Sequence, residues 1–270
     1  MISITDKTLQ DLEFTTVLQT ISERCNTEIG RQKALEIVPF KEKETLLDAL
    51  LQTSEYLSSF TNNNAIPNHG FDTITNDIKF LSIEDSFLEV GSFRKIATLS
   101  ETVNVLLLFL KKFNDYYPKL NEKAIQVDYT KYIIQKIDEV VDKYGEIKDN
   151  ASPDLINIRR DMSLVRGKVN QSFGQAMSQY NSLGYLDDIK ESFVENRRVL
   201  AVLAMYRRKV KGSILGSSKT GSIAYIEPET TLKYSRELNN LEYEEREEIT
   251  RILKKLSNEI RPHVALLKQY

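Results

Sequence analysis

The sequence has little of what most catalytic and metal sites require. It contains two histidines, His69 and His263, and one cysteine, Cys25, and none has a partner at metal-ligand spacing. We expect structural or surface roles for all three residues. No Gly-x-Ser-x-Gly elbow occurs, and no carboxylate pair stands out among the 39 acidic residues. We therefore expect no catalytic residue and no metal in this chain. A single cysteine also excludes an internal disulfide and is typical of the reducing cytoplasm.

Long apolar runs are missing, and glycine and proline are scarce. The longest apolar run, Val105–Leu110, has six residues, whereas a bilayer-spanning helix needs about 20. We therefore expect no membrane partner. Ten glycines and six prolines among 270 residues, with abundant Leu, Ile, Glu and Lys, favour helix. The sequence thus predicts a mainly α protein.

Residues 1–150 are predicted to form a helical core of short amphipathic helices. The pattern predicts one helix from Leu9 to Ile21 and another that begins after Thr27 as N-cap. Ser82–Asp85 resembles a capping box that begins a longer helix through Phe113, which Pro118 closes.

Two long helices are predicted in the second half of the chain. Ser152-Pro153 is a typical helix start, and apolar residues recur at steps of three and four from Leu155 to Tyr180. A second long pattern begins after Pro228, with a kink expected at Pro262. Residues 151–184 and 228–270 are most simply an antiparallel lever pair that carries the intervening residues at its tip. A four-helix-type bundle with an inserted hairpin is the alternative.

Residues 185–227 are the only part of the chain with β patterns. Four strands are predicted in this small antiparallel module, and the second has apolar residues on both faces. The expected strands are Ile189–Val194, Arg198–Tyr206, Val210–Leu215 and Ser222–Ile226.

The positive charge of the chain is concentrated in this module. Residues 190–219 contain eight basic and two acidic residues, a local charge of +6 in a chain whose net charge is −2. We expect a basic β module at the end of two acidic helical arms. Its cations fit phosphate contacts on a polynucleotide, but strand edges also carry Lys and Arg to prevent aggregation. Both interpretations remain open. The candidate nucleic-acid-binding residues are Arg197, Arg198, Arg207, Arg208, Lys209, Lys211 and Lys219.

Two smaller features of the module need interpretation. Tyr206 and Tyr225 fit base stacking, although strand tyrosines are more often core or cross-strand partners. Gly216–Gly221 ends like a phosphate-binding loop, but Ser218 and Ser213 occupy the places where that motif has glycine. We therefore expect a turn between strands and no nucleotide site there.

Three blocks of sequence resemble the MutS family, in the bacterial branch of paralogues that carry a C-terminal Smr domain. The resemblance covers nearly the whole chain, and its departure is Lys219-Thr220-Gly221, where the family tends to have a Ser-Ala-Ser-Gly type turn. The blocks are Gly145–Leu155 followed by Ile158-Arg159-Arg160; Asn196–Leu200 through Lys211–Ile214 to Ser222–Pro228; and Leu12-Glu13-Phe14 with Gly30 and Pro39.

The resemblance implies a helical core and lever with a clamp-like module at its tip. In this family the arms form a homodimeric ring around nucleic acid, driven by a following ATPase domain that uses ATP and Mg, and an Smr domain acts as a nuclease. Family roles include binding branched DNA, suppressing recombination and handling collided ribosomes. The chain has neither a phosphate loop nor an Smr pattern, so we expect a non-catalytic, nucleic-acid-clamping fragment without cofactors of its own. The alternative is a scaffold that dimerises and transmits ATPase motion without touching DNA or ribosomal RNA.

Overall fold

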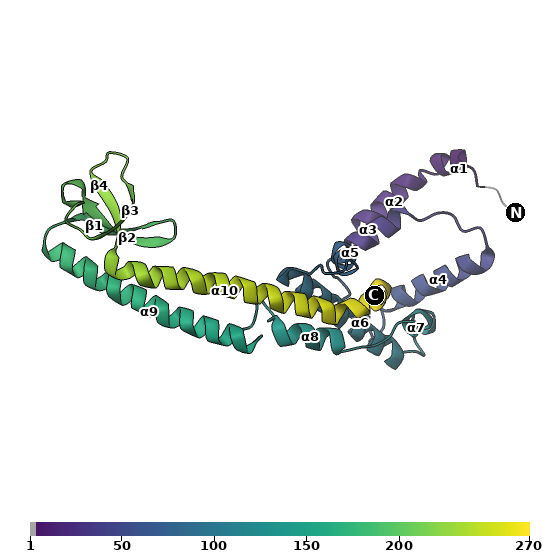
Figure 1. Ribbon diagram of the computed structural model, residues 1–270. Helices are drawn as coiled ribbons and strands as arrows, with labels where there is room; N and C mark the ends of the chain where they lie inside the picture. Colours follow the sequence, from purple (N-terminus) through teal and green to yellow (C-terminus); the bar gives the residue numbers. More distant parts are fainter. Residues whose placement is uncertain (1–3) are drawn as a thin grey trace. The chain divides into compact units, whose positions relative to one another are not determined.

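The computed structural model describes residues 4–270 and is mainly helical, as predicted (Figure 1). Its internal contacts divide the chain into two compact units. Unit 1 comprises the residues up to Lys148 together with Ile252–Tyr270, and unit 2 comprises Asp149–Arg251. Helix α10, Glu229–Ile260, contributes residues to both units. The division into core, lever and clamp at residues 150, 184 and 227 stays a prediction.

Unit 1 is built from short helices around α6. Its buried centre includes Phe93, Ile96 and Leu99 of α6 and Ile133 and Ile137 of α8. The helices are α1 Asp6–Asp11, α2 Phe14–Glu23, α3 Glu28–Leu35, α4 Lys43–Ser58, α5 Thr75–Leu81, α6 Val90–Lys112, α7 Pro118–Ala124, α8 Tyr132–Val140 and α11 Val264–Gln269.

Three boundaries in unit 1 differ from the prediction. The helix expected from Leu9 to Ile21 is interrupted at Glu13, whose φ of 50° is left-handed, so α1 and α2 are separate. Ser82 closes α5 as its C-cap, and α6 begins only at Val90, so no capping box forms at Ser82. Pro118 opens α7, because proline suits the first helical turn.

The other capping predictions in unit 1 are confirmed. The Thr27 side chain accepts a hydrogen bond from Gly30 N at 3.0 Å at the start of α3. Pro262 lies in a 3-10 turn, Arg261–His263, that separates α10 from α11. In the part of the chain that the structure describes, no helix has an apolar stretch long enough to cross a membrane.

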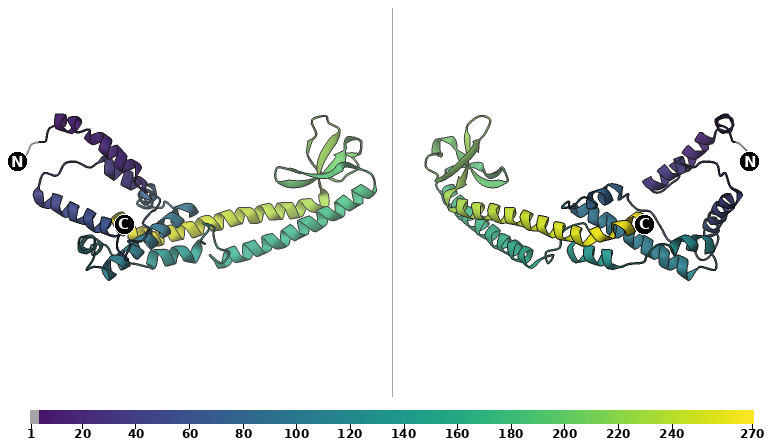
Figure 2. Two further views of the ribbon diagram at one scale, coloured as in Figure 1. Left: turned by 180° about the vertical axis from the view of Figure 1, so that it is seen from behind. Right: turned by 45° about the vertical axis from the view of Figure 1, so that its right-hand side comes forward.

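Unit 2 contains the predicted antiparallel pair of long helices (Figure 2). Helix α9, Pro153–Ser182, begins at Ser152, whose Oγ accepts a hydrogen bond from Leu155 N at 3.0 Å, and extends about 45 Å. The contacts between α9 and α10 show that the two helices are antiparallel, because residues early in α9 lie beside residues late in α10. Arg159 Nε contacts Glu245 Oε1 at 2.8 Å near one end, and Ser172 Oγ contacts Thr231 Oγ1 at 3.3 Å toward the other.

The expected acidic character of these arms is wrong. Helix α9 contains two acidic and four basic residues, and α10 contains eight acidic and six basic residues, so the pair is neutral in sum. The reason is that the negative surplus of the chain lies in residues 1–150, which contain 24 acidic and 17 basic residues. Some acidic residues of α10 also lie beside cations of α9. Glu245 pairs with Arg159, and Glu242 lies 3.7 Å from Arg166.

The β module is a four-stranded antiparallel sheet with the strand order β1-β2-β4-β3. The strands are β1 Leu186–Val194, β2 Arg197–Leu203, β3 Gly212–Ser217 and β4 Ile223–Pro228. The second strand is shorter than predicted, because Ala204–Tyr206 forms a 3-10 turn (η1).

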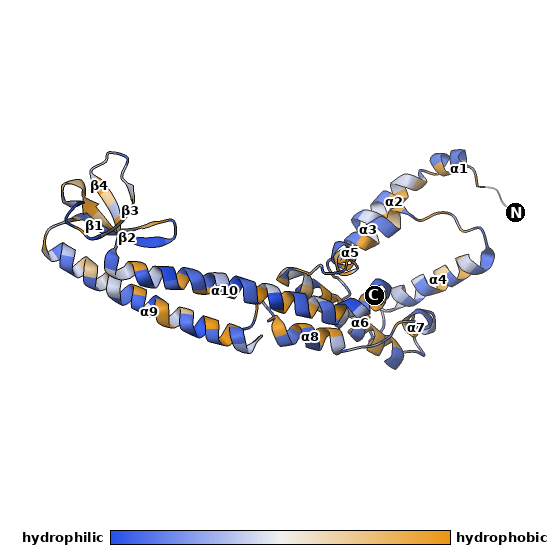
Figure 3. Ribbon diagram, in the orientation of Figure 1, coloured by the Kyte–Doolittle hydropathy of each residue, from blue (hydrophilic) through white to orange (hydrophobic). Residues whose placement is uncertain are grey.

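One face of the sheet packs on the C-terminal half of α9. Leu200, Val202 and Ile226 of the sheet are buried with Phe173 and Tyr180 of the helix. Figure 3 shows apolar colouring on part of the sheet and mixed colouring along the helices. This shared core fixes the loops of the sheet relative to the helix pair within unit 2.

Candidate nucleic-acid interface

Two loops of the sheet carry most of the predicted cations. The β2–β3 connection starts at η1 beside the β3–β4 turn, because Ala204 N donates to Ser222 O at 2.9 Å. It ends at Gly212, paired with Pro228. Buried Val210 anchors the connection in the sheet core. Both loops are therefore held by the sheet while their cationic side chains are exposed.

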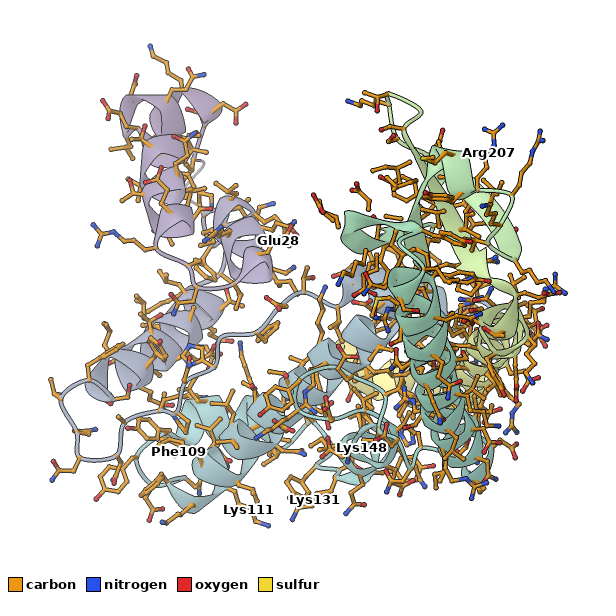
Figure 4. The ribbon with its side chains drawn as sticks, turned by 90° about the vertical axis from the view of Figure 1, so that its left-hand side faces the viewer. Glu28, Phe109, Lys111, Lys131, Lys148 and Arg207 are labelled. Atoms are coloured by element: carbon orange, nitrogen blue, oxygen red, sulfur yellow. The ribbon has the colours of Figure 1, made fainter. Side chains whose placement is uncertain are left out.

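Five of the seven predicted cations are exposed and have no ion pair with any residue in the described range 4–270. Figure 4 shows Arg207 on the β2–β3 connection of the sheet. The five are Arg207, Arg208, Lys209, Lys211 and Lys219. Lys190 of β1 is likewise exposed and outside every ion pair among these residues. This set could neutralise phosphates without first giving up a carboxylate partner.

The other two predicted cations are held by carboxylates of the sheet. Arg197 Nη1 lies 3.3 Å from Oε2 of Glu227, whose side chain is 1% exposed. Arg198 Nη2 donates to Glu191 Oε2 at 2.5 Å, and its guanidinium lies 4.4 Å from the ring centre of Phe173. Carboxylates of the sheet thus hold both arginines, and Arg198 also packs on Phe173 of α9. Their pairing depends on cross-strand neighbours, which the local sequence does not reveal.

Three tyrosines lie side by side beside the β2–β3 connection. The ring centres of Tyr180 and Tyr185 are 6.3 Å apart, and those of Tyr185 and Tyr206 are 4.6 Å apart, with interplanar angles of 23°. Lys209 Nζ lies 5.7 Å from the ring centre of Tyr185 and 5.5 Å from that of Tyr206. Of the two tyrosines considered from sequence, Tyr206 joins this stack, and Tyr225 is a half-buried partner of Ala201 across the sheet.

A cavity of about 350 Å³ opens beside the tyrosines, and Lys209 and Lys211 contribute to its lining. Tyr180 and Tyr185 also line it, although sequence analysis did not select them. No local signal connects Tyr180 to Lys211, because they are 31 positions apart. Only the fold brings the tyrosines and the lysines together.

The remaining features considered from sequence lie in a turn or contact neighbouring aromatic side chains. Gly216–Gly221 spans the end of β3 and the turn before β4, as predicted. His69 contacts Tyr56, and the ring of His263 lies 5.0 Å from that of Tyr132. Among residues 4–270, no cluster of three or more His, Cys, Asp or Glu could hold a metal ion.

Comparison with known proteins gives consistent matches along the chain. No protein-family model matches it. A protein named endonuclease MutS2 from Alkaliphilus oremlandii is 25% identical over 98% of the chain and 34% of its own length. Its namesake from Symbiobacterium thermophilum is 27% identical over 94% of the chain and 32% of its own length. That from Caldanaerobacter subterraneus is 28% identical over 95% and 32%. The chain is homologous to endonuclease MutS2.

The chain spans about a third of the length of these MutS2 relatives. The resemblance predicted from sequence blocks is thereby confirmed at the level of the family. Part of one block has a clear physical role. Gly145 has a φ of +82°, and it lies in a turn where Asp142 Oδ1 accepts hydrogen bonds from Glu146 N and Tyr144 N. The backbone hydrogen bond from Glu146, with those from Tyr144 and Gly145, lowers the pKa of Asp142.

Proposed function

We propose that the β module of this MutS2 homologue binds the sugar-phosphate backbone of nucleic acid. The observation that carries the proposal is the set of five exposed, unpaired cations on two neighbouring loops of unit 2, within the described residues. Lys and Arg contacts to phosphates position a protein on a nucleic acid without reading its sequence. We call this proposed binding of nucleic-acid phosphates by the β module the backbone grip.

Homology extends the proposal to the whole protein. We propose that the chain is a non-catalytic clamping and dimerising part of a MutS2-like ATPase. Its ligand is branched DNA, where it suppresses recombination, or ribosomal RNA. The relatives carry the name endonuclease and are about three times as long as the matched segment. Nuclease and ATPase activities, with ATP and Mg, are therefore proposed for the longer protein.

The test is charge reversal with a matched control. Arg207→Glu, Arg208→Glu and Lys209→Glu together should weaken binding to a DNA junction at least tenfold, because each lost phosphate contact removes counterion release. The control reverses Lys111, Lys112 and Lys131, which are exposed residues of unit 1. Figure 4 labels Lys111 and Lys131. The control changes net charge equally and should weaken binding much less. Equal weakening by both triple variants would reject the module as the binding surface.

A scaffold function is the second candidate, and exposed apolar residues in unit 1 favour it. Leu46, Leu47, Leu50 and Leu51 of α4 are each between 39% and 55% exposed. Large exposed apolar patches mark interaction sites in soluble proteins. In this alternative the chain dimerises and transmits motion from an ATPase domain without contacting nucleic acid.

Sedimentation of the 270-residue chain with and without a DNA junction separates the two functions. The clamping proposal predicts that the junction co-sediments with the protein. A dimer whose sedimentation is unchanged by the junction supports the scaffold and contradicts clamping by this chain.

A further inference from the structure

The cavity beside the tyrosine stack lies where the end of α9 meets the start of α10. Tyr180 and Leu183 from the end of α9, with Tyr185 just after it, give it aromatic and apolar lining. Lys209 and Lys211 from the β2–β3 connection also line it, and Lys209 Nζ lies near the tyrosine rings. All of these residues belong to unit 2. At about 350 Å³, the cavity falls within the range of about 300–1,000 Å³ that is typical of small-ligand sites.

The tyrosines and lysines hold one another in place. Tyr185 lies between Tyr180 and Tyr206 in the stack, so its ring has little freedom to turn. The hydroxyl of Tyr180 accepts a hydrogen bond from Lys211 N at 3.2 Å, which fixes the backbone of Lys211 beside the ring. Lys209 Nζ lies near two rings of the same stack. The aromatic lining is therefore preorganised next to both cations.

A second cavity in unit 2 provides a contrast. It is larger, about 470 Å³, and its lining includes Arg197 and Arg198. Both arginines already pair with carboxylates, Glu227 and Glu191. In the tyrosine cavity, by comparison, Lys209 and Lys211 have no ion pair among the described residues, although the carboxylate of Glu229 also lines the space. Of these two cavities of unit 2, the tyrosine cavity is the one that has aromatic lining together with lysines outside ion pairs.

Aromatic lining beside free ammonium groups matches the two halves of a nucleotide. A base buries apolar surface against aromatic and aliphatic side chains, and lysine contacts phosphate as a point charge. We propose that this cavity receives one nucleotide of a single strand, with its base against Leu183 and the ring edges of Tyr180 and Tyr185 and its phosphate at Lys209 and Lys211. This proposal rests on the proposed backbone grip, and adds a preference for unpaired nucleotides. A base inside a duplex cannot enter the cavity without unpairing.

The decisive comparison uses a short oligothymidylate and a strand of the same length built from abasic sugar-phosphates. Wild-type chain should bind the base-containing strand about tenfold more tightly, because the cavity buries one base, and this factor corresponds to about 1.4 kcal/mol. Leu183→Glu should abolish the difference by placing a carboxylate in the cavity, whereas the matched uncharged Leu183→Gln should keep it. Leu183 is 52% exposed, so neither substitution disturbs the sheet core. Equal wild-type affinities for the two strands overturn the proposal.

The two proposals fail in different ways. Reversing the charges of Arg207 and Arg208 should weaken binding of both strands by the same factor. If it does so while the wild-type chain shows no preference for bases, the backbone grip stands and the nucleotide cavity falls. Photocrosslinking gives a second readout on unmodified protein: a strand carrying 5-iodouracil should attach to Tyr180 or Tyr185. Attachment only outside the cavity lining also overturns the nucleotide site.

Discussion

Arginines only ten positions apart in this chain have different surroundings. Arg197 faces Glu227, a buried carboxylate whose Oε1 has no hydrogen-bond partner among residues 4–270. Arg207 is exposed on the β2–β3 connection and belongs to no ion pair in the same range. A buried carboxylate that loses its cation is costly, whereas an exposed cation without a partner is not. The two residues should therefore separate stability from binding.

Substitution of each arginine by glutamine tests this separation. Arg197→Gln should lower the free energy of unfolding by about 2–4 kcal/mol, because it leaves Glu227 buried without a cation. Arg207→Gln should change it by less than about 0.5 kcal/mol and weaken nucleic-acid binding instead. Urea denaturation and binding titrations on both variants measure the two effects. Wild-type stability in Arg197→Gln would show that Glu227 does not need its partner.

The edge strand β3 packs closely against β4 at Gly212. A Cβ added at Gly212 of β3 would meet Glu227 O at 2.1 Å, so only glycine lets β3 approach β4 here. Gly216 on the same strand has no such constraint, since its nearest neighbour, Tyr225 Cδ2, would be 3.9 Å away.

Alanine at each glycine tests this approach. Gly212→Ala should destabilise the protein by about 1–3 kcal/mol, because β3 must move away from β4. Gly216→Ala should cost much less, and it is the matched control. Thermal unfolding followed by circular dichroism measures both variants. Equal melting temperatures would contradict the close approach of the two strands.

The helix pair is fastened where α9 begins. Ser152 Oγ donates to Glu248 Oε1 at 2.5 Å, and Arg251 Nε donates to Glu248 Oε2 at 2.6 Å. Hydrogen bonding from Arg251 is the main cause that lowers the pKa of Glu248, with a smaller contribution from Ser152, while burial opposes both. The carboxylate therefore favours the folded state when it is ionised.

This fastening predicts a pH dependence of stability. Because the pKa of Glu248 is lower in the folded state, its stabilisation is complete above the ordinary value of 4.5 and is lost as the pH falls through the folded pKa. At pH 7, Glu248→Gln should lower the free energy of unfolding by about 1–3 kcal/mol. The difference from wild type should shrink below pH 4.5. The exposed neighbour variant Glu247→Gln is the matched control and should change stability at pH 7 by less than about 0.5 kcal/mol. A pH-independent deficit in Glu248→Gln would contradict the assignment.

Elements with strong local signals could be predicted from sequence. Helix boundaries that are set by a capping side chain or by proline were predicted correctly. They are at Ser152-Pro153, Thr27 and Pro262. Glu13 and Ser82 were mispredicted, because a left-handed residue and a C-cap have weak local signals. The strand expected through Tyr206 ends at Leu203, where η1 begins and the chain leaves the sheet.

The candidate site was only partly predictable for a related reason. Charge clustering along the chain located the basic module, but contacts between distant residues decide which cations are free. Glu191 and Glu227 hold Arg198 and Arg197, and these partners are 7 and 30 positions away. The tyrosine cavity depends on still more distant neighbours, so no motif could reveal it.

At the scale of the whole chain, positive and negative charges are unevenly distributed, but the two long helices are not acidic arms. The helix pair balances its own charges through ion pairs such as Arg159–Glu245 and Arg251–Asp154. The sheet loops, in contrast, keep five cations without partners among the described residues. The helix pair also has exposed cations outside these ion pairs, namely Lys168, Lys233, Arg236 and Arg246, but they are interspersed with acidic residues, whereas the module gathers five such cations within residues 207–219.

The salt dependence of binding tests this concentration of free charge most directly. Each phosphate contact on duplex DNA adds about −0.9 to the slope of log affinity against log salt concentration. Five contacts predict a slope of about −4.5 for the wild-type chain, and reversal of Arg207, Arg208 and Lys209 should reduce its magnitude by about 2.7. A slope that is unchanged in the triple variant would contradict phosphate binding by the β module.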